Sequence, residues 1–562
     1  MKELYIDLME KSLSAYSNGH ILRYFNDVKK NGLTEHGFPR LTANIGILIA
    51  HKRRADLLYI FLEMMEFCCK SIPKVLAAND FSVREIVCCI IELEENEAVD
   101  PKHTCRWREY LSKIEPTSCY NKFALDPSDD VRNWALFTGV SEYFRLSAGI
   151  GGDIDFIELQ IASQLKFFDE NGMYMDNKGS DVHHPILYDI MTRALFTMLL
   201  GRGYRGRYYE EIDAILKKAG LLTLSMQSSN GELAFGGRSN QFLHNEPVMA
   251  TVYEYEANRY AREGDLALAA EFKARTQRAI EVTKRWLSRS TLSHIKNRFP
   301  VASKYGCEGY AYFDKYMITV ASNLYAAYLI CDEAIPTGAL CDRKPVFFKT
   351  SEHFHKVFVK CGGYSLEFDT NADPHYDASG LGRVHRDGAT SAVCLACPCP
   401  AEPSYTVDIV KPVALSICSA VWDGDRWELL ANKGNRYELL DGAVTDKTAT
   451  AHFVCHFYNG ENIEEYYEVS EEGVFIAVKG EGRIGYVLPA FCFDGMRYPE
   501  VSIDDGSLSV KSKGWICRYT FDGELEDLQM TAANRNGHYG AFLVSGRDAL
   551  NIHISIFNGK HL

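Results

Sequence analysis

The chain has 562 residues, of which 46% are hydrophobic and 24% charged, a composition typical of soluble globular proteins. This length exceeds what one hydrophobic core usually serves, so we expect two domains. The net charge of −14 argues against a nucleic-acid backbone as the main partner, because binding phosphates requires a basic face.

The N-terminal segment and the cysteines indicate a cytoplasmic protein. Residues 1–20, MKELYIDLMEKSLSAYSNGH, carry acidic residues where a signal peptide would have its apolar core. The 17 cysteines are odd in number, and the pairs Cys68–Cys69 and Cys88–Cys89 lie in helix-like stretches, so we expect reduced, packed thiols. No apolar run approaches the roughly 20 residues that span a bilayer, so we expect no membrane partner.

As far as about Asp332 the sequence predicts one helix after another. Residues 154–170, 184–203 and 313–334 carry apolar residues at spacings of three and four, interrupted by Gly, Asn and Pro. A further stripe has the same period: Met249, Val252, Tyr253, Ala257 and Tyr260.

From about Lys344 the pattern changes to short β-rich segments separated by Gly, Asp and Asn turns, as in 355–370, 482–493 and 551–557. The turn-rich segment 333–345 marks the boundary. Helices followed by strands predict a helical domain and then an antiparallel β-sandwich. We place these domains at 1–335 and 344–562.

The segment FGGRSNQFLHNEP, residues 235–247, is the densest group of side chains suited to binding or chemistry. It precedes an apolar-periodic run, which predicts a helix start with Asn245 as the cap and Pro247 in the first turn. A helix N-terminus favours anions. A polar loop that only caps the helix would leave four side chains without a role: Arg238, Asn240, Gln241 and His244.

A second cluster lies in residues 297–316, where tyrosines surround Glu308. Tyrosines at helical spacing are usually core residues. Tyr305 and Tyr310, however, flank a glycine-bearing turn, so one of them is a candidate to face a cleft as a proton donor or acceptor.

A third cluster, residues 370–388, combines turn residues with several ionisable side chains: His375, Tyr376, Arg383, His385 and Arg386. A hairpin with solvated charges would explain it, as would a loop that reaches across to the helical cleft. Of the adjacent His183 and His184, at most one can face a site. No histidine or cysteine pair has strong zinc-ligand spacing, so we predict no metal and no cofactor; the CLACPC segment at 394–399 is interpreted as a strand with inward thiols.

The helical domain, the sandwich and these clusters together resemble the (α/α) toroid plus β-sandwich polysaccharide lyases, the heparinase II/III-like and oligo-alginate lyase group. The segments 133–146, NWALFTGVSEYFRL, and 169–179, DENGMYMDNKG, also look like parts of such toroids. The resemblance implies an (α/α) toroid and cleavage of uronic-acid glycosides by β-elimination.

Elimination needs a group that takes up enolate charge, a base for the C5 proton and an acid for the departing oxygen. The resemblance implies Asn240, with Arg238 and His244, for the charge; Tyr305 or Tyr310 for the proton; and His385 from the sandwich. The predicted substrate contacts are Arg238, Gln241, Glu246, His184, Arg383 and Arg386. For a cytoplasmic chain we expect exolytic trimming of short oligosaccharides, with loop 370–388 closing one end of the cleft.

Two alternatives from other classes stay open. A toroid glycoside hydrolase acting on uronic-acid or rhamnose-bearing oligosaccharides would use paired carboxylates, with four candidates: Glu232, Glu246, Glu308 and Asp181. A non-catalytic carbohydrate-binding protein would favour exposed tryptophans, yet none of the six lies in the three clusters. The sequence leaves the sugar, the linkage and a homo-oligomeric state open.

Overall fold

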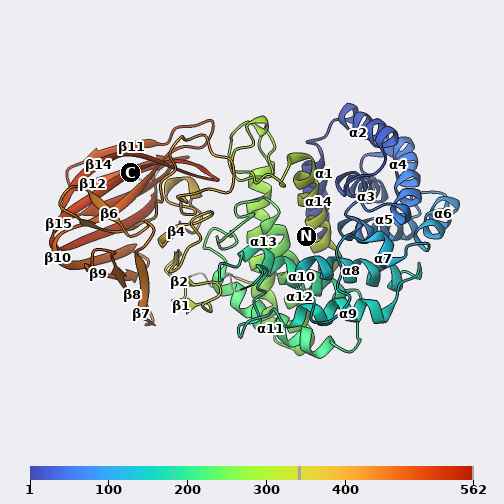
Figure 1. Cartoon of the computed structure of the whole chain (residues 1–562), viewed down its shortest axis with the longest axis horizontal. Helices are drawn as coiled ribbons and strands as arrows, with labels where there is room; N and C mark the ends of the chain where they lie inside the picture. Colours follow the sequence, from blue (N-terminus) through green and yellow to red (C-terminus); the bar gives the residue numbers. More distant parts are fainter. Residues whose placement is uncertain (180–181, 340–342, 560–562) are drawn as a thin grey trace.

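The computed structural model describes residues 1–179, 182–339 and 343–559. It consists of a helical domain and a β-domain side by side, as the sequence predicts (Figure 1). All α-helices of the described residues lie between Lys2 and Ile330, and all strands between Val346 and Asn558. None of the described helices combines the length and apolar character needed to cross a membrane.

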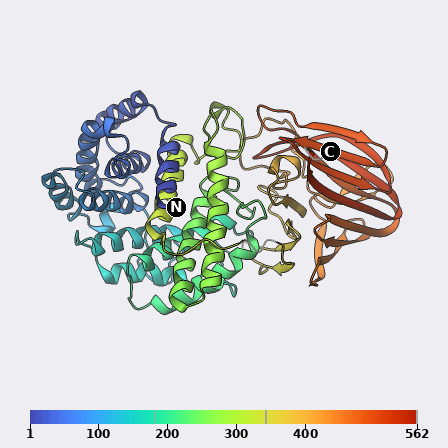
Figure 2. The same cartoon turned by 180° about the vertical axis from the view of Figure 1, so that it is seen from behind.

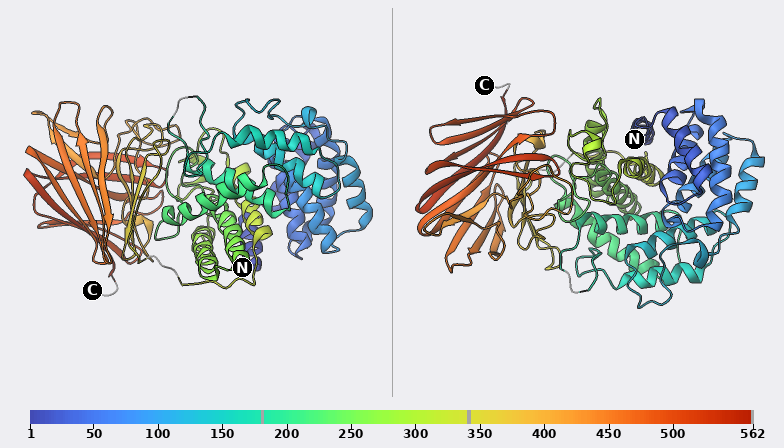
Figure 3. Two further views of the ribbon diagram at one scale, coloured as in Figure 1. Left: turned by 90° about the horizontal axis from the view of Figure 1, so that it is seen from below. Right: turned by 45° about the horizontal axis from the view of Figure 1, so that its top comes forward.

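The helical domain is built from two layers of helices. Six inner helices contact one another in chain order, and the last of them contacts the first, so that they close a ring. The inner helices are α3 (Gly37–Ala50), α5 (Val83–Glu95), α8 (Asn133–Ser147), α10 (Ile186–Gly201), α12 (Asn245–Glu263) and α14 (Phe313–Ile330). The others are α1 (Lys2–Leu13), α2 (Asn18–Asn31), α4 (Leu58–Ser71), α6 (Pro101–Leu111), α7 (Pro116–Cys119), α9 (Ile154–Leu165), α11 (Tyr209–Met226) and α13 (Leu266–Leu287). Figure 3 shows the helices following one another around this ring.

Burial explains which helices lie inside. In α3 every residue is buried, as expected for a helix that is apolar on nearly all sides, whereas α2 buries only Ile21, Phe25 and Val28. Gly46 lets α3 approach its neighbours, because a Cβ there would lie 2.3 Å from the sulfur of Cys89. The apolar stripe predicted for residues 249–260 is buried in α12, which confirms that prediction.

The β-domain contains two antiparallel sheets. The four-stranded sheet has the order β1 (Val346–Lys349), β2 (Lys356–Cys361), β3 (Tyr364–Asp369) and β4 (Gly380–Arg386). The eleven-stranded sheet comprises β5 (Cys418–Trp422), β6 (Trp427–Leu429), β7 (Arg436–Val444), β8 (Ala449–His456), β9 (Asn462–Val469), β10 (Val474–Phe493), β11 (Glu500–Asp504), β12 (Ser507–Ser512), β13 (Trp515–Phe521), β14 (Glu524–Asn534) and β15 (Gly537–Asn558). The long strands β10 and β15 pair along most of their length at its centre.

The small sheet lies between the helical domain and the large sheet (Figures 1 and 2). Phe358 of β2 joins an apolar cluster with residues of α10 and α12, while Phe368 of β3 packs against Phe453 of β8, with ring centroids 4.8 Å apart. Strands β2 and β3 are therefore buried on both faces. This position makes the small sheet the junction between the domains.

One predicted strand is wrong. Residues 394–398 form bends and irregular chain after a short 3-10 turn, and Cys399 makes only an isolated bridge with Leu415. The thiols of Cys394, Cys397 and Cys399 are nevertheless buried, as the sequence suggested. The burial of these thiols was therefore predicted correctly although the strand was not.

Candidate active-site cleft

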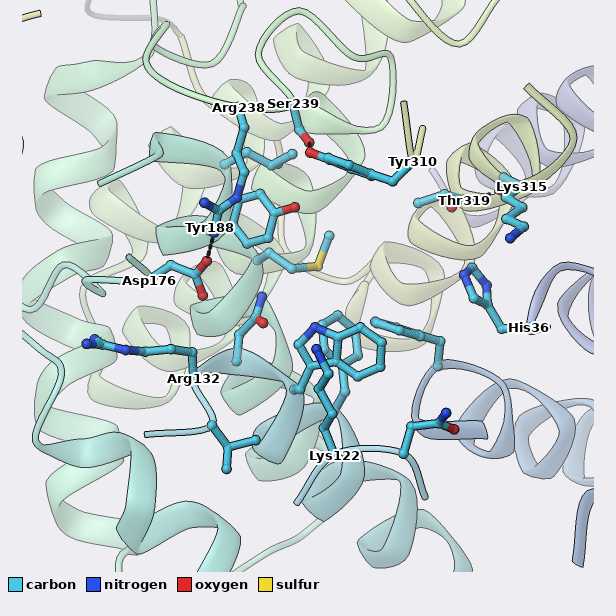
Figure 4. Close-up of a pocket in the computed structure, with 18 of the residues that line it drawn as sticks. His36, Lys122, Arg132, Asp176, Tyr188, Arg238, Ser239, Tyr310, Lys315 and Thr319 are labelled. Atoms are coloured by element: carbon cyan, nitrogen blue, oxygen red, sulfur yellow. Dashed lines mark hydrogen bonds and ion pairs between the residues drawn. The ribbon is translucent and has the colours of Figure 1, made fainter. Parts of the chain in front are cut away.

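A cleft of about 890 Å³ opens in the helical domain (Figure 4). Its walls include residues from the first turns of all six inner helices or directly before them. These are His36 and Arg40 at α3, Arg84 at α5, Asn133 and Trp134 at α8, Leu187 and Tyr188 at α10, His244 at α12, and Lys315 and Tyr316 at α14. The ring therefore directs six helix N-termini toward one space.

These N-termini direct the positive ends of their helix dipoles toward the cleft. The first N–H groups of a helix have no partner within the helix, and the helix dipole places its positive end there. In none of the six described inner helices does the residue before the first turn cap the helix with its own side chain. Carboxylates nevertheless meet several of these ends: the N–H of Gly37 in α3 donates to Oε2 of Glu35 at 2.7 Å, and four inner helices carry an acidic residue in the first turn, namely Glu85, Asp189, Glu246 and Asp314. The helix ends favour a bound anion only together with the cationic side chains around them.

Side-chain charge acts in the same direction. The described lining contains seven cations, Arg40, Arg84, Lys122, Arg132, Lys178, Arg238 and Lys315, and two carboxylates, Asp130 and Asp176. Behind the lining, Glu85 contacts Arg40 and Arg84, and Glu35 lies 3.2 Å from Lys315. Cations still outnumber these carboxylates by seven to four, although the whole chain carries −14.

Arg238 is fixed at one end of the cleft. Its Nη1 donates to the side-chain oxygen of Asn177 at 2.6 Å, and its Nη2 forms an ion pair with Asp176. The guanidinium lies over the ring of Tyr188, 4.3 Å from the centroid. These contacts hold the guanidinium in one orientation at the cleft wall, where Asp176 offsets its charge (Figure 4).

Tyrosine hydroxyls lie beside this arginine. The Tyr310 hydroxyl is 2.9 Å from Oγ of Ser239, and the Tyr310 and Tyr316 rings lie 6.1 Å apart. Burial of the hydroxyl end, with Tyr188 and Glu308 nearby, holds the pKa of Tyr310 well above its usual value, although 44% of the residue is exposed. Tyr310 is therefore a neutral phenol at physiological pH, able to donate its proton.

His244 supplies an unprotonated imidazole. Burial, together with His294 and Arg40, lowers the pKa of His244 to about 3. Its Nδ1 is buried without a hydrogen-bond partner. At neutral pH this ring is uncharged, and its low pKa makes it a weak base in the empty cleft.

An aromatic wall completes the cleft. Phe81 packs edge-on against Trp134 and Phe137, with centroids 4.6 Å apart in both cases, and Nζ of Lys122 lies over the Trp134 ring at 4.4 Å. Sequence reasoning did not assign these residues to the site. A usable signal was present, because RNW at 132–134 and HGFPR at 36–40 place basic and aromatic residues at the starts of α8 and α3.

Three predicted site residues, Arg238, His244 and Tyr310, line the cleft. Asn240 and Gln241 lie in the same loop but are buried beside it, with Nε2 of Gln241 donating to Oδ1 of Asn240 at 3.2 Å. The interpretation of Asn245 as a side-chain cap needs correction. α12 begins at Asn245, whose amide instead donates to the carbonyl of Ser239 at 3.3 Å.

Tyr305 lies away from the cleft. Its ring stacks on Phe299 with centroids 3.6 Å apart, its hydroxyl is buried without a partner, and burial raises its pKa. His184 is also buried behind the lining, where its Nδ1 accepts from the backbone N–H of Asn177 at 3.1 Å.

The predicted residues of β4 lie at the domain junction. Arg383 is buried and donates to the carbonyls of Ala396 and Leu233, and His385 lies 3.1 Å from Oγ of Ser228. Arg386, half-buried, donates to the Tyr364 hydroxyl at 3.0 Å. No described residue of 370–388 lines the cleft, since β4 is enclosed between the two domains.

The carboxylates considered for hydrolysis are engaged elsewhere. Glu246 lies 2.5 Å and Glu232 3.5 Å from Nζ of Lys296, and Glu308 pairs with Arg535. Burial raises the pKa of Glu246, whereas Lys296 overcomes burial and lowers the pKa of Glu232 to about 2. Asp181 lies outside the described residues. Among the residues that are described, no group of three His, Cys, Asp or Glu is placed to hold a metal ion.

No family model matches the sequence, and no curated protein matches it either. Several solved structures are similar in overall architecture. Heparinase III has a TM-score of 0.47 at 9% identity, covering 92% of this chain and 76% of that one. Xanthan lyase from Paenibacillus scores 0.49 at 8% identity, covering 92% and 54%. Chondroitin AC lyase from Streptomyces coelicolor A3, solved with chondroitin sulphate, scores 0.47 at 10% identity, covering 99% and 82%.

Proposed function

We propose that this cleft is the active site of a lyase that cleaves uronic-acid-containing oligosaccharides by β-elimination. One observation supports this most strongly: six inner-helix N-termini and an excess of cationic side chains meet tyrosine hydroxyls and a neutral histidine in one cleft. The helix N-termini and the cations favour an anionic substrate. The tyrosine hydroxyls and the histidine are suited to proton transfer.

Arg238 is the proposed carboxylate-binding residue. Its guanidinium is oriented by Asp176 and Asn177 and supported by the Tyr188 ring, so little rotational freedom is lost when a substrate binds. The amide of Asn133, at the first position of α8, provides a neutral donor for the charge that develops as the enolate forms.

The proton steps are assigned to His244 and Tyr310. An uncharged imidazole accepts the C5 proton, and the bound carboxylate favours the protonated ring that results, because an opposite charge raises a histidine pKa. Tyr310 then gives its proton to the departing glycosidic oxygen. The electrons of the C5–H bond form the new double bond as the C4–O bond breaks.

Hydrolysis by two carboxylates is less well supported. Of the described lining residues only Asp130 and Asp176 are acids, and they form ion pairs with Arg132 and Arg238. A glycoside hydrolase needs one carboxyl group to donate a proton and a second to act as base or nucleophile.

The cleft volume of about 890 Å³ is within the range of sites that enclose a small ligand. We therefore propose short oligosaccharides, cleaved from one end, as substrates. The test is to incubate the protein with a panel of uronic-acid oligosaccharides and to follow ultraviolet absorbance and product size. Elimination creates a conjugated double bond that absorbs ultraviolet light, whereas hydrolysis does not. New reducing ends that form without an increase in absorbance would refute the lyase assignment. Rapid size loss of a long polymer at low product yield would refute end-wise cleavage.

A further inference from the structure

The backbone N–H groups of the two residues that flank Arg238 are both bonded by buried carboxylates. The N–H of Gly237 donates to Oδ2 of Asp377 at 2.7 Å, and the N–H of Ser239 donates to Oε1 of Glu308 at 2.7 Å. Asp377 belongs to the β-domain, in the loop between β3 and β4. Arg238 itself projects from between these two fixed points into the cleft (Figure 4).

The second carboxylate is also anchored on the β-domain. Nη1 of Arg535, in the turn between β14 and β15, donates to Oε2 of Glu308 at 2.8 Å. The Arg535 guanidinium lies over the ring of Tyr405 at 4.0 Å and is almost fully buried. Both supports of the Arg238 loop therefore end on residues of the β-domain.

The loop needs such support because its backbone is strained. Ser239 and Gln241 both have φ of 61°, in the left-handed region that side chains disfavour. Gly237 has φ of 72°, and a Cβ there would lie 2.9 Å from Pro185. Conformations of this kind persist only where surrounding contacts hold them.

We propose that Asp377 and the Glu308–Arg535 pair are positioning residues through which the β-domain clamps the Arg238 loop and so sets the geometry of the cleft. This inference rests on the proposed role of Arg238 in binding the substrate carboxylate. The clamp residues touch no substrate; they fix the backbone on either side of the residue that does. A carboxylate contact present in both ground and transition states contributes to KM more than to kcat, so a loosened clamp raises KM first.

The kinetic test uses the full chain and a uronic-acid disaccharide. Asp377→Ala removes the acceptor for Gly237, and the KM is expected to rise about 10- to 100-fold, the equivalent of one hydrogen bond to a charged acceptor. Asp377→Asn retains an acceptor oxygen and should restore most of the affinity. Glu465→Gln is the matched control, because Glu465 is a buried β-domain carboxylate that accepts the N–H of Ser419 at 2.7 Å. Its KM should stay that of the wild type.

Amide hydrogen exchange of segment 235–241 gives a readout that does not need activity. Exchange there should accelerate in Asp377→Ala and in Arg535→Lys, and stay at the wild-type rate in Glu465→Gln. If Asp377→Ala does not fold, Asp377→Asn and Arg535→Lys supply the same comparison. Unchanged exchange and KM in folded variants would overturn the clamp while leaving the lyase proposal intact. Absence of any lyase activity would refute the proposed function, and the exchange result would still decide the clamp.

Discussion

Replacing Tyr310 with phenylalanine separates the proposed chemistry from the stability of the fold. The change removes one hydroxyl from a residue that is 44% exposed and breaks its contact with Oγ of Ser239 at 2.9 Å. A single neutral hydrogen bond contributes about 1 kcal/mol, so the free energy of unfolding should fall by no more than about that amount.

The expected loss of activity is much larger. A positioned general acid contributes about 10²- to 10⁴-fold to kcat, equivalent to roughly 3–5 kcal/mol of transition-state stabilisation. The raised pKa of Tyr310 means that the group keeps its proton beyond pH 10, the ordinary value for tyrosine. The wild-type rate should therefore show no loss from this group as pH rises from 7 toward 10.

The assay is the initial rate of ultraviolet absorbance increase on the best uronic-acid oligosaccharide, with a thermal melt of each variant. Tyr312→Phe is the matched control: Tyr312 is 46% exposed, two residues away, and outside the cleft lining. A Tyr310→Phe protein that melts like the wild type and keeps kcat within about threefold would refute the assignment, because that loss is far below the contribution of an acid.

Three further predictions concern charge. Arg238→Ala should raise KM and lower kcat/KM by about 10- to 100-fold, and a methyl-esterified substrate should be poor for the wild type. If Arg238→Ala keeps full activity at low substrate concentration, the arginine has only a structural role. Raising salt from about 0.05 to 0.5 M should raise KM severalfold by screening the cleft, and a salt-independent KM would contradict the electrostatic argument. Glu232, with its pKa lowered from 4.5 to about 2, contributes stability that is present above pH 4.5 and lost as pH falls toward 2. The stability deficit of Glu232→Gln should therefore be on the order of 3 kcal/mol at pH 7 and vanish near pH 2, as chemical unfolding at both pH values would show.

Much of the fold is predictable from local pattern. Helices α9, α10 and α14 lie within the segments whose apolar period marked them, and the hairpin of β2 and β3 lies within 355–370. Periodicity reports which face of an element is buried, and it does so from a few neighbouring residues. Periodicity does not predict the order of the inner helices in the ring, because that order depends on contacts between segments far apart in the chain.

The site was only partly predictable for the same reason. Tyr305 and Tyr310 are five residues apart in one turn, and no local pattern distinguishes them. The difference appears only in the tertiary structure: Glu308, between them, is bonded by Arg535 of the other domain, Tyr310 lines the cleft and Tyr305 stacks on Phe299. Arg383 and His385 looked available because polar residues alternate along β4. That strand is enclosed by both domains, so its polar side chains bind backbone carbonyls and hydroxyls across the junction.

The cationic lining of the cleft is the clearest example of a feature that local sequence pattern cannot predict. His36, Asn133 and His244 lie about a hundred residues apart along the chain, so no local pattern shows that they share one cleft. Each stands at the start of an inner helix, and closing the ring brings these starts together, so six small dipoles are directed toward the same cleft. A chain with a net charge of −14 can thus gather cationic side chains around one cleft without a long basic segment in its sequence. The proposed preference for an anionic substrate is in this sense a property of the ring: it requires that the inner helices all begin on the cleft side, and a single reversed helix would replace a positive end with a negative one.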